Sequence, residues 1–541
     1  MCKIAKPLLR AATTTSLLGL LACSDPTHMD TTPVALAEVE DCPATLEWLP
    51  NTPPVTMFKP SPHPTTECPF YRGVWQNFLI AMQPVDDAGT PAILSYPTID
   101  TVFQSSKPHA ANRSYLGDIK QAGGRQIVID QNGRSLYYGI HVNQAYADFI
   151  HQNHLETGKA IQAYSKDPGQ SRLFFPAGVA EFKSAWQIVD EANPPADLAD
   201  YVTIKTTVPT LSQDPVTHAI LEDKDTPLPV TARLLAIHVV YTYPGHPEFI
   251  WGSLEHSAGT PDTSAMDGMR NVAPITSEDK NPSSTDPNDA NDTAVVSPHD
   301  FLLYKANTMA KDGNNAIADA DLKLDPATQS FTKSDGTSAQ TSIYRMFPAS
   351  KSNDVTPDGA ITSLNHNMEA VFAQAALPAS DRRAHYRLLG GQWMDKPAYF
   401  RVNIPIQDDN SSPFAPAPGS PADVYGVGIG LKALTTAIGT DGSDSAFSIL
   451  AGENRMSSTS MESFTQAPDS FNNCFTCHNT QAVTAKGVSF DRNFGVGAIK
   501  LLEPGLLNVS HVLSQFVLEE CAGPGATLNP NADGSTTAVC P

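Results

Sequence analysis

ARLLAIHVVYTY at residues 232–243 and EFIWGSL at residues 248–254 decide the fold of this chain. Both stretches are rich in β-branched, aromatic and other apolar residues, and a short turn separates them. Runs of this length and composition predict β-strands. We therefore expect a strand in each of the two stretches.

Further strand patterns lie on both sides of this pair. Asn132-Gly133 stands between two β-rich runs, and this dipeptide is a strong signal for a hairpin turn. A second stretch that leans toward β structure covers residues 341–406. The individual strands expected outside these two stretches are residues 125–129, 135–140, 172–175, 201–207 and 399–404.

The composition supports a globular protein with many loops. Of 541 residues, 41% are hydrophobic and only 17% are charged, while 45 are proline and 34 are glycine. The predicted fold class is α+β, with a β-rich body of sandwich-like strands and long loops and a small helical region at the C-terminus. The formal charge of −22 argues against a nucleic acid as partner, because a phosphate backbone requires a basic surface.

The first 22 residues have the pattern of a signal peptide. Basic residues at positions 3, 6 and 10 precede an apolar stretch, residues 11–22, that is too short to span a bilayer. It ends in Leu20-Leu21-Ala22-Cys23, which resembles the lipobox of bacterial lipoproteins. The resemblance implies a lipid on Cys23 and a secreted protein anchored in the periplasm or at the outer membrane. An ordinary secretory signal with a chance cysteine is the alternative.

The remaining cysteines suit an oxidising compartment. Of eight cysteines, Cys2 lies in the signal peptide, Cys23 takes the lipid, and two belong to a motif described below. Four are left, and they allow three connectivities. We favour the two local pairs, which are Cys42 with Cys68 and Cys521 with Cys540.

Changes in composition divide the chain into successive parts. Residues 1–22 form the signal peptide, and the Pro/Thr-rich residues 23–65 form a tether. Residues 66–410 form the β-rich body, which contains a polar insertion at 258–298. A proline-rich linker leads to the C-terminal region, residues 424–541.

The C-terminal region contains the motif Cys474-Phe475-Thr476-Cys477-His478. The pattern Cys-x-x-Cys-His is that of c-type haem attachment. On a helix, positions i, i+3 and i+4 lie on one face, so both thiols and the imidazole project together. A zinc site would need a second pair of ligands, which is missing here. We expect one covalent haem c, held by Cys474 and Cys477, with His478 as proximal iron ligand.

The ligand on the other face of the iron decides what such a haem does. Small cytochromes c supply a methionine after the motif, but no methionine follows His478. The candidates are His511 downstream, Met456 and Met461 upstream, and His256 in the body. An open or water-bound site and a more distant histidine are the alternatives.

Several stretches resemble a family of large bacterial "cytochrome c family" proteins with one C-terminal haem. The resemblance covers about half of the chain, and the order of the stretches carries it. It implies a haem protein of the periplasm or the cell surface, with no settled substrate. The stretches are residues 174–186, 235–240, 249–256, 386–393 and 461–466.

Some residues of the body have two interpretations. His238 lies in the apolar strand 234–240, and a buried, hydrogen-bonded histidine is favoured over a distal iron ligand or proton relay. His256 follows Glu255 at the end of a strand. For this residue, a core histidine and a distal ligand or proton relay are favoured equally. We expect Glu181 and Lys183 on a solvated strand face, and Trp186, Trp251 and Trp393 in the core.

Three functions are compatible with the motif. The favoured one is a membrane-tethered electron-transfer cytochrome with a redox partner protein. The second is a haem-dependent oxidoreductase, similar to a peroxidase or oxygenase, with an open distal site. The third is a haem-based sensor or binding module. We find no Ser-His-Asp set, phosphate-binding glycine loop or carboxylate pair in the sequence.

Overall fold

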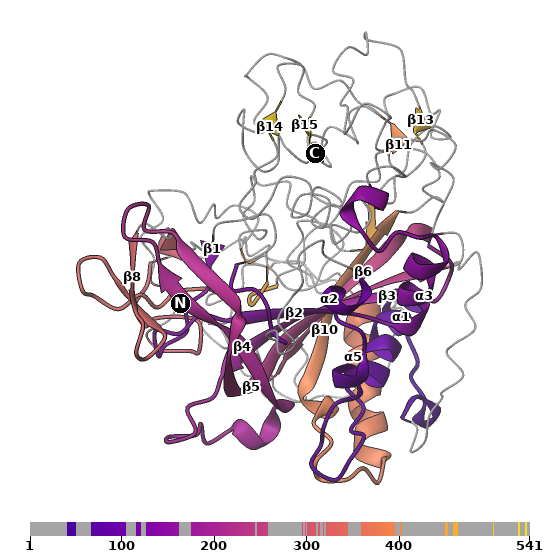
Figure 1. Ribbon diagram of the computed structural model, residues 1–541. Helices are drawn as coiled ribbons and strands as arrows, with labels where there is room; N and C mark the ends of the chain where they lie inside the picture. Colours follow the sequence, from indigo (N-terminus) through magenta and orange to yellow (C-terminus); the bar gives the residue numbers. More distant parts are fainter. Residues whose placement is uncertain are drawn as a thin grey trace, which may run out of the picture. The chain divides into compact units, whose positions relative to one another are not determined.

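The structure is a computed structural model of the 541-residue chain (Figure 1). The residues it describes are 41–49, 66–103, 115–120, 126–161, 175–243, 246–257, 295, 298, 300–309, 312–313, 317–318, 321–344, 359–394, 401–402, 450–452, 458–461, 463, 501–502, 529–530 and 536–537.

An antiparallel seven-stranded sheet forms the centre of the body. Its strand order is β12-β10-β6-β5-β3-β2, and β4 pairs with the first half of the long strand β5. The prediction of a β-rich body is therefore confirmed. The strands are β2 (Tyr137–Val142), β3 (Ala180–Ile188), β4 (Thr203–Gln213), β5 (Ile220–Tyr243), β6 (His246–His256), β10 (Tyr386–Met394) and β12 (Leu450–Gly452).

The two stretches that decide the fold are the central strands β5 and β6. They pair antiparallel, with Val239 opposite Gly252 and Ile237 opposite Leu254. The expected turn at Asn132-Gly133 is also present. Gly133 has a φ of 74°, and its amide donates to the carbonyl of Asp130 at 3.0 Å. Glycine adopts this left-handed conformation without strain, which is why it occupies the turn.

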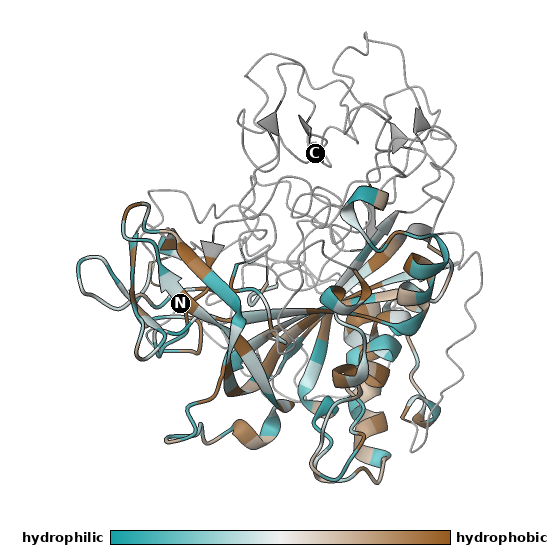
Figure 2. Ribbon diagram, in the orientation of Figure 1, coloured by the Kyte–Doolittle hydropathy of each residue, from teal (hydrophilic) through white to brown (hydrophobic). Residues whose placement is uncertain are grey.

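Two helices cover one face of the sheet, α1 (Cys68–Ala81) and α5 (Gly359–Gln374) (Figure 1). Eleven of the fourteen residues of α1 are buried, because this helix packs against β5, β6 and β10 on one side and against α5 on another. Along α5 the buried residues recur at helical spacing and form one face. Figure 2 shows the resulting alternation of brown and teal along α5. The expectation of β structure throughout 341–406 was therefore wrong for residues 359–374.

Close backbone approach sets the packing of α1 on the sheet. A β-carbon added at Gly73 would clash with the ring of Tyr241 in β5. One added at Gly252 in β6 would clash with the side chain of Val74. The two glycines thus let the helix lie directly on β5 and β6, where Tyr241 Oη donates to the carbonyl of Phe70 at 2.8 Å.

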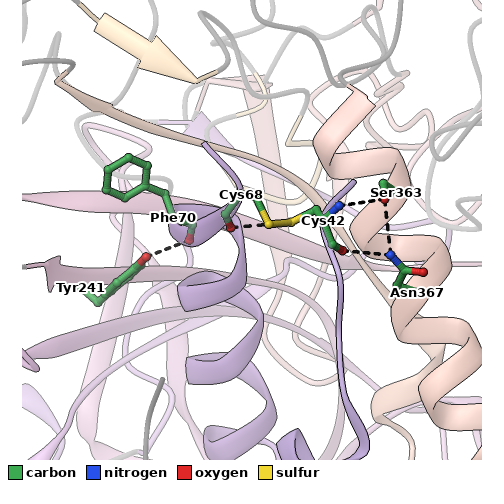
Figure 3. The surroundings of a disulfide bond; sticks show 6 residues. All are labelled: Cys42, Cys68, Phe70, Tyr241, Ser363 and Asn367. Atoms are coloured by element: carbon green, nitrogen blue, oxygen red, sulfur yellow. Dashed lines mark hydrogen bonds between the residues drawn. A yellow bond between two sulfur atoms is a disulfide. The ribbon is translucent and has the colours of Figure 1, made fainter. Parts of the chain in front are cut away.

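A disulfide ties the N-terminal part of the body to the start of α1. Cys42 and Cys68 are bonded, as the local pairing predicted (Figure 3). The amide of Cys42 donates to Ser363 Oγ of α5 at 3.1 Å, and Asn367 Nδ2 donates to the Cys42 carbonyl at 3.0 Å. Residues 41–49 belong to the stretch expected to be a tether, but Cys42 and Trp48 are buried in the core. The tether prediction was therefore wrong for these residues, because the disulfide and α5 hold them against the body.

The other elements are short. Four further strand pairs form two-stranded sheets: β1 with β7, β8 with β9, β11 with β13, and β14 with β15. The bounds are η1 (Leu46–Trp48), η2 (Ala92–Ser95), α2 (Ile99–Val102), β1 (Gln126–Ile127), α3 (Gln144–Gln152), η4 (Leu198–Asp200), β7 (Ile317–Ala318), β8 (Leu322–Asp325), β9 (Ser330–Lys333), η7 (Arg383–His385), β11 (Arg401–Val402), β13 (Leu501–Leu502), β14 (Asn529–Pro530) and β15 (Thr536–Thr537).

Candidate functional site

The face of the sheet opposite α1 and α5 carries polar residues in register. Side chains alternate between the two faces of a strand, so residues paired across neighbouring strands lie in rows on one face. Six residues on this side define what we call the polar face. They are Glu181, Lys183, His238, Ser253, Glu255 and Gln392.

The strand register orders this side into three adjacent rows. The first row contains Tyr138, Ala185, Ala236 and Glu255. The second contains Ile140, Lys183, His238, Ser253 and Gly390. The third contains Val142, Glu181, Val240, Trp251 and Gln392. Neighbouring rows are about 7 Å apart, because each is two residues along the strands.

Glu255 binds a segment from a distant part of the chain. Its carboxylate is fully buried and accepts three hydrogen bonds, from Ser458 Oγ at 3.2 Å, Thr459 N at 2.7 Å and Thr459 Oγ1 at 2.8 Å. A buried carboxylate is stable only when donors surround it in this way. We call residues 458–461 the anchor segment.

The other end of the anchor segment is held by β2. Tyr138 Oη donates to the carbonyl of Ser460 at 2.8 Å. Between Tyr138 and Glu255 the first row contains only Ala185 and Ala236, whose small side chains leave room above β3 and β5. The anchor segment therefore lies across these two strands.

Met461 completes the attachment of the anchor segment. Its side chain is fully buried in an apolar cluster on this side of the sheet. The sequence named Met461 as a candidate iron ligand. In the structure its side chain packs against apolar residues of the body. The other members of the cluster are Val128, Leu136, Tyr138, Ala185, Tyr201, Leu235, Ala236, Leu302, Leu303 and Ile343.

His256, another candidate ligand, is enclosed by the body. The ring is fully buried and stacks on Tyr201, with centroids 3.6 Å apart and an angle of 9° between the planes. Nε2 lies 3.1 Å from the carbonyl oxygen of Asp200, and the ring of Tyr386 meets the histidine edge-on. Of its two interpretations, the structure supports a hydrogen-bonded core histidine.

A buried polar network lies beside this histidine. The guanidinium of Arg233 lies 4.4 Å from the centre of the Tyr201 ring and donates to Gln187 Oε1 at 2.7 Å. Gln187 in turn donates to Asp130 Oδ2, at 2.5 Å. Burial raises the pKa of Asp130 above its ordinary value, although the hydrogen bond from Gln187 acts in the opposite direction. The network connects the 130–133 turn to the end of β6.

His238 and Lys183 occupy the middle of the second row. They lie opposite each other on β5 and β3, and both are partly exposed, whereas Ser253 next to His238 is fully buried. The ammonium of Lys183 lies 5.2 Å from the centre of the Tyr138 ring. Glu181 is buried, so the expectation of a solvated strand face was wrong for that residue. His238, which we expected to be a hydrogen-bonded core histidine, is partly buried.

Another histidine, His141, did not stand out in the sequence. It lies on the helix-covered face of β2, is fully buried, and packs against Tyr115 at a centroid distance of 4.7 Å. Neither of its ring nitrogens has a hydrogen-bond partner among the described residues. Burial lowers the pKa of His141 to about 3. No local pattern marks such a histidine, because its burial comes from other strands and loops.

Most residues of the expected haem site lie outside the described part of the chain. These are Cys474, Cys477, His478, His511 and Met456, together with Cys23, Cys521 and Cys540. The polar insertion, apart from Val295 and Pro298, and most of the expected strand 172–175 lie outside it as well. Trp186, Trp251 and Trp393 are buried, as expected.

Within the described residues, no group of three or more His, Cys, Asp and Glu side chains is arranged to hold a metal ion. None of the helices described here has the length and apolar character that crossing a bilayer requires. No family model, no curated protein and no solved structure matches the chain.

Proposed function

We propose that this protein is a secreted, lipid-anchored c-type cytochrome that carries one covalent haem and transfers electrons in the periplasm or at the cell surface. The observation that carries the proposal is the motif Cys474-x-x-Cys477-His478. Cys474 and Cys477 would hold the haem through thioethers, and His478 would be the proximal ligand. Haem c supplies reversible one-electron transfer to and from a redox partner protein.

The anchor segment supports a close association of the haem-bearing region with the body. Ser463, which is buried, precedes Cys474 by eleven residues. A chain of that length spans at most about 40 Å. The motif is thus attached by a short stretch to a region of the sheet that contains buried polar side chains. A region of this kind can exclude water from a cofactor and still offer it polar contacts.

The compartment in the proposal has two supports. The Cys42–Cys68 disulfide is stable in an oxidising environment, such as the periplasm or the cell surface. The basic residues at positions 3, 6 and 10, followed by Leu20-Leu21-Ala22-Cys23, suit export and lipid attachment. The lipid would hold the protein at a membrane surface.

Covalent haem attachment is the direct test. The full chain is produced in a host with a c-type maturation system. It is then run on a denaturing gel, and the gel is stained for haem. We expect haem at the mass of the protein, and none in a C474A/C477A variant, because non-covalent haem is lost on denaturation. The C521S/C540S variant removes a different cysteine pair and should keep the stain. A wild-type protein without covalent haem would refute the proposal.

The spectrum of the intact holoprotein then tests the assignment as electron carrier. A six-coordinate, low-spin haem that cycles between its two oxidation states without binding carbon monoxide is expected of a carrier. A high-spin haem that changes on addition of peroxide or carbon monoxide would instead indicate the oxidoreductase or the sensor.

A further inference from the structure

A short segment, residues 115–120, covers the outer edge of the central sheet, and we call it the strap. Strand β2 is the last strand in the order of the sheet. The strap binds its backbone twice, with Gly117 N donating to the Tyr138 carbonyl at 3.0 Å and Tyr138 N donating to the Asp118 carbonyl at 2.7 Å. An open edge would expose these backbone groups, so the strap takes the place of a further strand at this point.

The strap also covers part of the apolar core and a buried histidine. Leu116 and Ile119 are fully buried. Tyr115 packs on the ring of His141, with centroids 4.7 Å apart. The amide of Leu116 donates to the carbonyl of Thr207 in β4 at 3.0 Å, which ties the strap to a second strand. Opening the strap would therefore expose the edge of β2, two apolar side chains and the histidine ring to water.

Charged side chains hold the second half of the strap against β5. Asp118 Oδ1 lies 2.9 Å from Lys224 Nζ. The amide of Ile119 donates to Glu222 Oε1 at 2.8 Å. The register between β4 and β5 shifts at residues 224–226, and an irregularity of this kind redirects the side chains of its strand. As a result, β5 presents both a carboxyl group and an ammonium group to the strap.

Two carboxyl groups, those of Asp118 and Glu222, meet at this contact. The direct ion pair of Lys224 is with Asp118. Glu222 accepts from the amide of Ile119, and a protonated carboxyl group can still accept this hydrogen bond through its carbonyl oxygen. Neutral Glu222 thus keeps its bond to the strap without placing a second negative charge beside Asp118.

We propose that the strap is a pH-sensitive closure of the sheet edge, held shut while Glu222 is protonated and loosened when Glu222 ionises. This closure requires no haem, so it is independent of the proposed function. The titratable and charged groups that face Glu222 are Asp118 and Lys120 of the strap, Lys224 of β5 and Tyr137 of β2.

The electrostatics of the cluster set the direction of the pH dependence. Burial and the negative charge of Asp118 raise the pKa of Glu222 to about 7, although Lys224 and the amide of Ile119 act in the opposite direction. With the strap open, the same group has its ordinary pKa of 4.5. The stabilisation of the closed strap is therefore complete below about pH 4.5 and is lost as the pH rises toward 7. Against the effect of burial, nearby carboxylates, including Asp100 of α2, raise the pKa of Lys224, so it stays charged in this range.

Hydrogen exchange of the strap amides in the full-length protein tests this closure. Exchange is measured by mass spectrometry on peptides that contain residues 115–120, between pH 5 and pH 8. Each rate is divided by the intrinsic chemical rate at the same pH. We expect the protection of the wild type to fall by up to about tenfold per pH unit up to pH 7, and to change little above it. Protection that does not depend on pH in the wild type would overturn the proposal.

Three variants distinguish Glu222 from other titrating groups. E222Q keeps a hydrogen-bond acceptor but cannot ionise, so its strap should stay protected over the whole range. D225N, the control, changes an exposed carboxylate of the same strand and should keep the wild-type profile. D118N removes the neighbouring negative charge, so the fall in protection should move to lower pH, and this holds even if E222Q does not fold. A wild-type profile in E222Q or in D118N would contradict the proposed closure.

Discussion

His141 shows what a single buried histidine does to the pH dependence of stability. Its ring is enclosed by the body, and burial lowers its pKa to about 3. In the unfolded chain the same group has a pKa of about 6.5. Below that pH the unfolded state binds a proton that the folded state does not, so the protein loses stability as the pH falls from about 6.5 toward 3.

The variant H141F tests this pH dependence. Phenylalanine keeps a ring against Tyr115 but cannot take up a proton. As the pH falls from 6 to 4, the free energy of unfolding of H141F should rise relative to that of the wild type by about 1 kcal/mol for each pH unit. Urea unfolding at several pH values measures this difference. The control is H366Q, which changes a side chain that is 74% exposed. Its free energy of unfolding should depend on pH in the same way as that of the wild type.

Asn365 joins three elements through one side chain. Its Oδ1 accepts from Trp75 Nε1 of α1 at 3.2 Å and from the amide of Leu388 in β10 at 3.0 Å. Its Nδ2 donates to the Leu388 carbonyl at 2.9 Å. Asn365 is buried, so these hydrogen bonds hold α5, α1 and β10 in one arrangement.

Replacing Asn365 by alanine should be strongly destabilising. N365A leaves the Trp75 ring nitrogen and both backbone groups of Leu388 buried without this partner, which costs about 3 kcal/mol or more. Urea unfolding monitored by tryptophan fluorescence measures the loss. The exposed N193A is the control, with an expected effect within about 0.5 kcal/mol. An N365A protein as stable as its control would contradict the role of this side chain.

At the level of elements, the contact between α1 and β6 depends on Gly252. A G252A variant places a methyl group against Val74 and should cost about 1–3 kcal/mol through overpacking. The double variant V74A/G252A should lose less than the sum of the single variants, because the smaller helix side chain makes room. Additive losses in urea unfolding would show that the two residues are not in contact.

G117A is the matched glycine control. A β-carbon at Gly117 would make an ordinary contact of 3.5 Å with Lys224 Nζ. We therefore expect its stability to stay within about 0.5 kcal/mol of the wild type.

The anchor segment and β6 are coupled through Glu255. An E255A variant removes the acceptor of three hydrogen bonds and should cost about 2 kcal/mol or more. It should also speed tryptic cleavage after Arg455, which shortly precedes the anchor segment in the sequence. The exposed E47A is the control. Unchanged cleavage in E255A would mean that Glu255 does not retain the segment.

For the whole molecule, the proposed lipid on Cys23 is the feature that can be tested in cells. A C23S variant cannot receive the lipid, because the thiol is the site of attachment. The protein should then move from the membrane fraction to the soluble fraction, as followed by immunoblot after cell fractionation. C521S, which changes a cysteine far from the signal peptide, should stay with the membranes. A membrane-bound C23S protein would contradict the lipid anchor.

The sequence predicted several parts of the fold because their signals are local. The strands β5 and β6 appear as apolar, β-branched runs, and the Asn132-Gly133 turn as a dipeptide with the required backbone preference. The short loop between Cys42 and Cys68 suggested their pairing. Helix α1 was missed, since it is buried on nearly all sides and lacks the polar stripe that marks an amphipathic helix.

By itself, then, the sequence determined two of the strands, the turn and one disulfide, and it predicts a haem at Cys474, Cys477 and His478. Only the tertiary structure decided which residues face one another. Glu255 and Ser458 are 203 positions apart, yet they share a hydrogen bond. Lys183, His238 and Ser253 form one row only because three strands pair in that register. Register follows from packing of the whole sheet against its helices, and no stretch of the sequence contains that information alone.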